Sequence, residues 1–234
     1  GLTLFQVCKP LSQMLDAGVV APVAAADLVP LAEECLEDGR LEDAVALCER
    51  AIESTVGLPE AHALAAEACC AADRYEDAVS HLVAEADHRV AVGDLVSAAQ
   101  CLDEARRILP TDLTVREGLL SLCVGEAAVQ VDGLDPIAEG KEVVAGLVEV
   151  GHLDRARALL ERLLLAGPGD AELKVALVNL HVRAGDHARV VELYESIAED
   201  LVRARRPLEA VAYLQKILLL DRHRTDISQR VRRL

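Results

Sequence analysis

The chain has 234 residues and a net charge of −16, and its residues are 52% hydrophobic but only 2% aromatic. The acidic balance argues against nucleic acid as a main partner, because phosphate binding needs a basic surface. Abundant Ala, Leu and Val with few aromatic rings favours helices packed closely side by side. No uncharged apolar stretch approaches the roughly 18 residues of a membrane span, and the first residues lack the basic leader of a signal peptide. We expect a cytoplasmic protein, and the composition resembles that of a bacterial one.

Helical periodicity recurs along the whole chain. The predicted helices of the first half lie near 3–16, 27–38, 41–54, 59–72, 75–92 and 95–109. Those of the second half lie near 113–129, 136–150, 153–166, 170–184, 187–204 and 207–221, and a thirteenth begins near Thr225. The segment Gly18–Ala26 fits either a loop or a short helix. No alternating strand pattern is bounded by turns, so the predicted fold is all-α with about 12–13 helices.

Capping residues mark many of these boundaries. Carboxylates that can accept free backbone N–H groups are expected as N-caps at Asp27, Asp94, Asp135 and Asp170. Proline at a first helical turn is expected at Pro136 and Pro207. Left-handed C-caps are expected at Gly39, Gly151 and Gly185.

A helix–turn–helix segment recurs six times. Its first helix carries a small residue, its turn is Gly-like, and its second helix carries another small residue near the start. The first-helix residues are Ala32, Ala66, Ala86, Val144, Val178 and Ala198; the turn residues are Gly39, Asp73, Gly93, Gly151, Gly185 and Arg205; the second-helix residues are Ala44, Ala78, Ala98, Ala156, Val190 and Ala210. This pattern resembles the tetratricopeptide repeat family, with Leu in place of most of the family's aromatic residues. The resemblance implies a right-handed superhelical solenoid of antiparallel helix pairs.

The spacing of the small residues indicates a duplication. The intervals Ala32–Ala66 and Val144–Val178 are both 34 residues, and three marker residues recur at an offset of 112. We predict a first six-helix module at 1–112, a second at 113–224, and the start of a further helix at 225–234. Because the chain begins at Gly1 without Met, we expect it to be part of a longer protein.

Cysteines and histidines show no metal-site spacing. The seven cysteines are odd in number, CxxC and HExxH are absent, and no His lies three or four residues from another. The thiols are expected to be structural and largely protected from alkylation, and no metal or cofactor is predicted. No catalytic motif is present, so we expect no enzyme activity.

The basic C-terminal segment is the strongest rival signal. Leu201–Leu234 contains nine basic and three acidic residues, against 15 and 37 in the rest of the chain. These arginines could contact phosphate, but the simpler interpretation is that they complement helix C-termini at the end of a solenoid. The open ends of such a solenoid would also allow a homo-oligomer.

The resemblance implies a partner-binding groove lined by the first helix of each pair. The predicted groove residues are Glu33, Glu37, Glu67, Asp87, Glu149, Glu172, Asn179, Arg183, Glu199 and Arg203. The family's carboxylate clamp is absent, since Lys141 is followed one turn later by Ala145. The acidic residues of the first module favour a protein or peptide partner with a basic surface, whereas Arg183 and Arg203 give the second module a less cationic partner. The predicted function is a non-catalytic interaction scaffold; the alternative is the sensor or regulatory arm of a larger signalling or transcription protein that binds a peptide or small effector.

Overall fold

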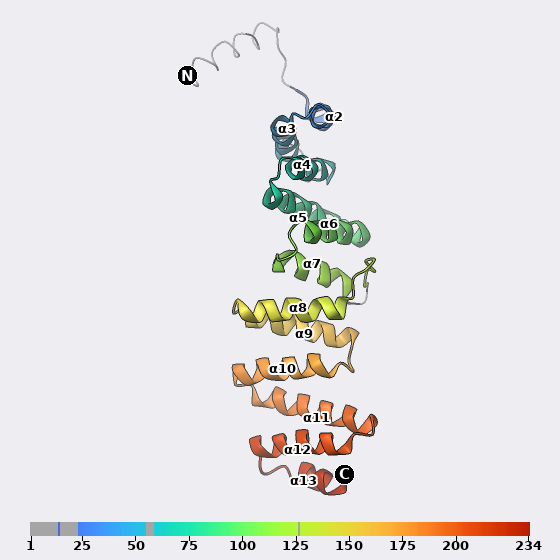
Figure 1. Cartoon of the computed structure of the whole chain (residues 1–234), viewed down its shortest axis with the longest axis vertical. Helices are drawn as coiled ribbons and strands as arrows, with labels where there is room; N and C mark the ends of the chain where they lie inside the picture. Colours follow the sequence, from blue (N-terminus) through green and yellow to red (C-terminus); the bar gives the residue numbers. More distant parts are fainter. Residues whose placement is uncertain (1–13, 15–22, 55–58, 126) are drawn as a thin grey trace. The chain divides into compact units, whose positions relative to one another are not determined.

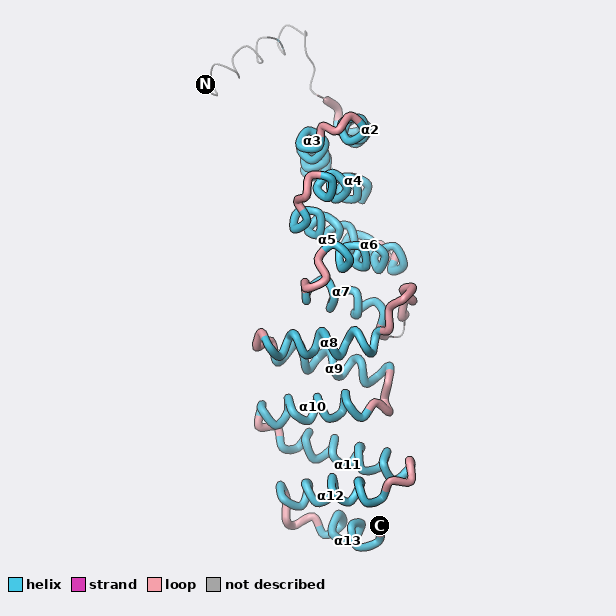
Figure 2. The backbone as a smooth tube through the Cα atoms, viewed as in Figure 1, coloured by secondary structure: helices cyan, strands magenta, loops and turns pink. Residues whose placement is uncertain are grey.

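The computed structural model describes residues 14, 23–54, 59–125 and 127–234, and in these ranges every regular element is a helix (Figure 2). Cys8 and nearly all of the helix predicted near 3–16 lie outside the described residues. The chain divides into two compact units, Gly1–Pro110 and Thr111–Leu234. No described helix is long and apolar enough to cross a membrane.

The first unit contains helices that pack against their neighbours in sequence (Figure 1). They are α2 (Ala25–Glu37), α3 (Leu41–Ser54), α4 (Pro59–Ala71), α5 (Tyr75–Ala91) and α6 (Leu95–Ile108). Helix α2 also contacts α4, the next helix but one. This contact is expected in a stack of antiparallel pairs, so the predicted all-α helical repeat is confirmed in this unit.

The second unit repeats this arrangement. Its helices are α7 (Leu113–Cys123), α8 (Pro136–Glu149), α9 (Leu153–Ala166), α10 (Ala171–Ala184), α11 (His187–Arg203), α12 (Pro207–Leu220) and α13 (Thr225–Arg233). Helices α3 to α7 start at residues 41, 59, 75, 95 and 113, and α9 to α13 start 112 residues later at 153, 171, 187, 207 and 225. The helix starts therefore follow the offset that the small residues indicate, while the proposed module boundaries remain a prediction.

One helix and one cap differ from the prediction. The helix predicted at 113–129 ends at Cys123, because Val124 is extended and Gly125 has a φ of 152°, which no helix tolerates. The prediction of Asp27 as an N-cap is wrong. Helix α2 begins at Ala25, so Asp27 lies in its first turn, where its negative charge interacts favourably with the helix dipole.

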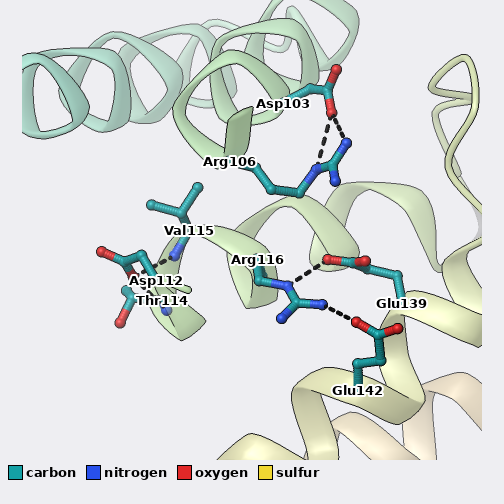
Figure 3. A network of polar contacts seen from close by, with 8 residues as sticks. All are labelled: Asp103, Arg106, Asp112, Thr114, Val115, Arg116, Glu139 and Glu142. Atoms are coloured by element: carbon teal, nitrogen blue, oxygen red, sulfur yellow. Dashed lines mark hydrogen bonds and ion pairs between the residues drawn. The ribbon is translucent and has the colours of Figure 1, made fainter. Parts of the chain in front are cut away.

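The other predicted caps are confirmed. The carboxylates of Asp94, Asp135 and Asp170 accept hydrogen bonds from backbone N–H groups of the first turns of α6, α8 and α10. Two further aspartates that the sequence analysis missed, Asp112 and Asp186, cap α7 and α11 in the same way, and Figure 3 shows Asp112 beside Thr114 and Val115. Short polar caps therefore fix where most helices of the second unit start.

The turns within the helix pairs share a left-handed residue. Gly39, Gly93, Gly151 and Gly185 have φ between 73° and 83°, whereas the equivalent Asp73 and Arg205 have φ of 57° and 58°. A side chain other than Gly costs about 1 kcal/mol in this conformation. Asp73 accepts a hydrogen bond from the Tyr75 hydroxyl, but Arg205 is exposed and has no such compensation.

We therefore expect Arg205→Gly to stabilise the second unit by up to about 1 kcal/mol, because relief of the backbone strain outweighs the added freedom of the unfolded chain. The converse variant, Gly93→Ala, has open space around the new methyl group and should destabilise the first unit by a similar amount. Urea denaturation measures both free energies. A destabilising Arg205→Gly would show that the arginine makes a stabilising contact which outweighs the strain.

The two units have cores of different residue size. Buried positions of the first unit are occupied by Cys48, Ala51, Ala61 and Ala65, each 0% exposed. The residues 112 positions later are all buried leucines: Leu160, Leu163, Leu173 and Leu177. Small residues let the helix backbones of the first unit approach closely. Each Ala or Cys in place of Leu buries less apolar surface, which lowers the hydrophobic stabilisation by roughly 2 kcal/mol, at about 0.8 kcal/mol per methylene.

Hydrogen exchange should reveal this difference. We expect amides of α2–α4 to exchange before those of α8–α10, with opening free energies lower by several kcal/mol, because each leucine of the larger core buries about 2 kcal/mol more. Helices α12 and α13 are the internal control for fraying at a chain end. Equal protection of α2–α4 and α8–α10 would contradict the expectation.

Candidate interaction grooves

The first unit has an open groove formed by α4, α5 and α6. Its volume is about 440 Å³, and its lining residues include Glu67 and Cys70 of α4, Glu85 and Arg89 of α5, and Glu104 of α6. We call it the acidic groove. Since α4 and α6 flank α5, the repeat itself creates the hollow: the two outer helices supply walls and the middle helix supplies the floor.

The charges of the acidic groove differ in their pairing. Glu85 is 3% exposed and accepts two hydrogen bonds from the guanidinium of Arg89, at 2.5 and 2.8 Å. Glu67 and Glu104 are exposed on the walls, and neither enters an ion pair within the described residues. The groove therefore presents two carboxylates without an ion-pair partner among the described residues, together with the Glu85–Arg89 ion pair.

A cysteine of α6 also lines the acidic groove. Burial raises the pKa of the Cys101 thiol to about 11, and the charge of Glu85 acts in the same direction. The thiol is therefore protonated at neutral pH and is a weak nucleophile. This position supplies packing to the groove and no activated nucleophile.

The second unit has a groove formed by α8, α9 and α10, with a volume of about 370 Å³. Its walls and floor are mostly aliphatic, and we call it the apolar groove. The lining residues are Lys141, Val144, Ala145 and Val148 of α8, Leu160 of α9, and Glu172, Leu173, Ala176, Asn179, Leu180 and Arg183 of α10. Gly140, one turn from the groove on α8, lets that helix approach α9, because a methyl group there would meet the Leu163 side chain at 2.6 Å.

Polar groups sit around the rim of the apolar groove. The Lys141 ammonium lies 2.6 Å from the Glu172 carboxylate and 2.9 Å from that of Asp170, and these hydrogen bonds, that with Glu172 first, raise the pKa of Lys141. Arg183 is exposed on α10, one turn after Asn179, and makes no ion pair with any described residue. At the rim, the ammonium of Lys141 is thus neutralised by carboxylates, and the guanidinium of Arg183 is available to a ligand.

Ion pairs connect two helices of the second unit and link side chains along one helix of the first. Within the second unit, Arg116 of α7 donates to Glu139 at 2.6 Å and to Glu142 at 2.8 Å, which ties α7 to α8 (Figure 3). Within the first unit, Asp103 is 5% exposed on α6 and accepts hydrogen bonds from Arg106 in the same figure. These pairs are stabilising parts of the scaffold and are not free to bind a ligand.

The structure separates the predicted groove residues into two groups. Those that line a groove are Glu67, Glu172, Asn179 and Arg183. Those that lie exposed on their helices outside both grooves are Glu33, Glu37, Asp87, Glu149, Glu199 and Arg203. Two of this second group are also paired: Glu199 lies 3.5 Å from Arg230, and Arg203 lies 3.0 Å from Asp200.

The sequence analysis missed Glu104 and the aliphatic walls. Glu104 was missed because it lies on α6, which was expected to be the second helix of its pair. The exposed apolar side of α8, around Ala145 and Val148, was a signal in the sequence that could have predicted the apolar groove.

Comparison with known proteins gives the following. No known protein-family profile matches the chain, and no curated protein matches it. Among solved structures, MamA 41-end from Desulfovibrio magneticus RS-1 is 15% identical, with a TM-score of 0.24 over 87% of this chain and 99% of that one. YrrB, described as a TPR protein with an unusual peptide-binding site, is 13% identical, with a TM-score of 0.25 over 90% and 93%. A tetratricopeptide repeat protein from Parabacteroides merdae is 13% identical, with a TM-score of 0.26 over 96% and 89%.

These neighbours are 13–15% identical to the chain, with TM-scores of 0.24 to 0.26. At such TM-scores they show no common arrangement of the whole chain, so the fold rests on the helix pairs seen within each unit. The chain is an all-α helical-repeat protein.

Proposed function

We propose that the chain is a non-catalytic scaffold that binds segments of partner proteins in its two grooves. The observation that supports this most directly is the apolar groove, an open hollow with a mostly aliphatic lining beside the guanidinium of Arg183, which pairs with no described residue. Helical repeats build such concave surfaces for binding extended or helical segments. Its volume also falls in the range of pockets that enclose a few side chains.

The lining of each groove indicates the chemistry of its ligand. In the apolar groove, aliphatic side chains of a segment would cover Ala145, Val148 and Ala176, and a carboxylate of the same segment would pair with Arg183. In the acidic groove, Glu67 and Glu104 would pair with a Lys or Arg side chain. We propose that the two grooves bind either one partner with a surface of mixed charge or two different partners.

Two variants separate the grooves in a binding assay. Ala145 is exposed on the wall of the apolar groove, so Ala145→Trp should fill that groove without disturbing the core. The double variant Glu67→Gln with Glu104→Gln should remove the charge of the acidic groove. Its matched control is Glu33→Gln with Glu37→Gln, the same charge change on exposed residues outside the groove.

Peptides selected by display against the intact chain are suitable probes for these variants. Ala145→Trp should weaken the binding of apolar peptides that carry an acidic residue at least tenfold. The Glu67 and Glu104 double variant should slow the association of basic peptides, and added salt should have the same effect. If the Glu33 and Glu37 control has the same effect as the double variant, general surface charge and not the groove attracts the partner. If the affinities of the selected peptides are the same for the wild type and all three variants, the proposal is overturned.

A second candidate function is the regulatory arm of a larger protein, in which the apolar groove binds a small effector. Its volume of about 370 Å³ is adequate for a ligand of that size. Small-molecule binding that Ala145→Trp abolishes, with no selected peptide competing, would favour this alternative.

A further inference from the structure

Two histidines from neighbouring helices meet in the first unit. His62 of α4 and His81 of α5 place their Nδ1 atoms 3.3 Å apart, and their rings are tilted by 49°. Both residues are half-buried at the contact between the two helices. They are 19 residues apart in sequence, so no helical spacing rule could have revealed the pair.

The distance between the two nitrogens matches metal coordination. Zinc binds imidazole nitrogen at about 2.05 Å, and two such ligands on a tetrahedral ion lie about 3.3 Å apart. A neutral pair can also share one hydrogen bond, in which the Nδ1–H of one ring donates to the Nδ1 lone pair of the other. A cation between the two rings would instead take the lone pairs of both Nδ1 atoms.

The surroundings keep the pair neutral. Burial lowers the pKa of His62, and the nearby His81 and His88 lower it further, while Glu85 opposes them. Burial also lowers the pKa of His81, where Glu49 and Asp77 act in the opposite direction and Arg74 in the same one. Neutral imidazole is the form that binds metal.

The equivalent position of the second unit carries a different link between helices. Lys174, 112 residues after His62, donates a hydrogen bond to Ser196 at 2.8 Å and pairs with Asp200, which joins α10 to α11. Among the described residues of the first unit, no ion pair joins α4 to α5. Both arrangements put polar groups where the first helix of a pair contacts the second.

We propose that His62 and His81 form a binding site for a divalent transition metal of the zinc class, held through both Nδ1 atoms. Among the described residues no third His, Cys, Asp or Glu completes a larger cluster, so water fills the remaining coordination positions. The bound ion ties α4 to α5, the two helices that form one wall and the floor of the acidic groove. This revises the expectation of no metal, which considered only histidines on one helix.

Zinc titration by calorimetry at pH 7.5 tests the site. The wild-type chain should bind one Zn²⁺ with both histidines, and His62→Ala and His81→Ala should each weaken binding at least tenfold. His223→Ala is the matched control, since His223 is exposed in the second unit. His81→Gln keeps most of the side-chain volume and should lose binding without loss of helix content, which circular dichroism checks.

Thermal unfolding gives an independent readout. Zinc should raise the Tm of the wild type and of His223→Ala but not of the two histidine variants. Zinc binding that survives both variants would place the metal on other residues, and no saturable binding would mean that the imidazoles only hydrogen-bond to each other; either result overturns the proposal. Peptide binding to the apolar groove is unaffected by either outcome, so the site and the scaffold function can fail separately.

Discussion

Replacing Asp200 with Ala should destabilise the second unit by about 3 kcal/mol. Lys174 is 8% exposed, and its ammonium is balanced by Asp200 of α11 with help from Ser196. Removing one partner of a buried ion pair leaves an uncompensated charge, which typically costs about 3–5 kcal/mol. Ser196 and the partial exposure of Asp200 keep the expected loss at the lower end of this range.

The matched variants make this result interpretable. Lys174→Met removes the charge but keeps the aliphatic stem, so it should cost less than Asp200→Ala or even stabilise the unit. Asp154→Ala breaks an exposed pair with Arg157 and should change stability by well under about 1 kcal/mol. Urea denaturation gives all three values. A loss below about 1 kcal/mol for Asp200→Ala would mean that water reaches Lys174.

Leu163→Ala should cost about 3–4 kcal/mol, the second large effect. Leu163 is 0% exposed, lies in the leucine cluster of α8, α9 and α10, and contacts the place where Gly140 lacks a side chain. Truncation removes buried methyl groups and leaves a cavity that close-packed helices fill only partly. Leu165→Ala, two residues later on the same helix and 83% exposed, is the control and should be nearly neutral.

The Leu163 result would also report on the grooves. The same cluster contains Val144, Leu160 and Leu173, which form the floor of the apolar groove. A destabilised Leu163→Ala chain with unchanged peptide affinity would show that the floor stays in place. A cost below about 1 kcal/mol, measured by the same urea titration, would contradict the packing that the structure shows.

Most of the fold could be predicted because its signals are local. Turn glycines and helix-start prolines act on the backbone of their own residue, and capping aspartates act on N–H groups two or three residues later, so helix positions follow from the sequence alone. The helix at 113–129 was predicted too long because apolar residues continue past Cys123, while Gly125 adopts a backbone conformation outside the helical region. Apolar periodicity does not detect such a break.

The candidate site was only partly predictable because it depends on how the helices rotate against one another. Knowing that a residue lies on a first helix does not say which way it faces, and Glu67 lines the acidic groove while Glu33 and Glu37 do not. The carboxylate of Glu104 and the pairing of His62 with His81 come from contacts between helices, which no spacing within one helix encodes.

Photo-crosslinking at two positions tests the scaffold proposal most directly. A benzophenone amino acid at Ala145 stands in the apolar groove, and one at Leu165 stands on an exposed part of α9 outside it. With a selected peptide at its dissociation constant, the proposal predicts adducts at position 145, their loss on competition with unlabelled peptide, and few adducts at position 165. Equal labelling at both positions, or labelling at 165 alone, would contradict binding in the groove.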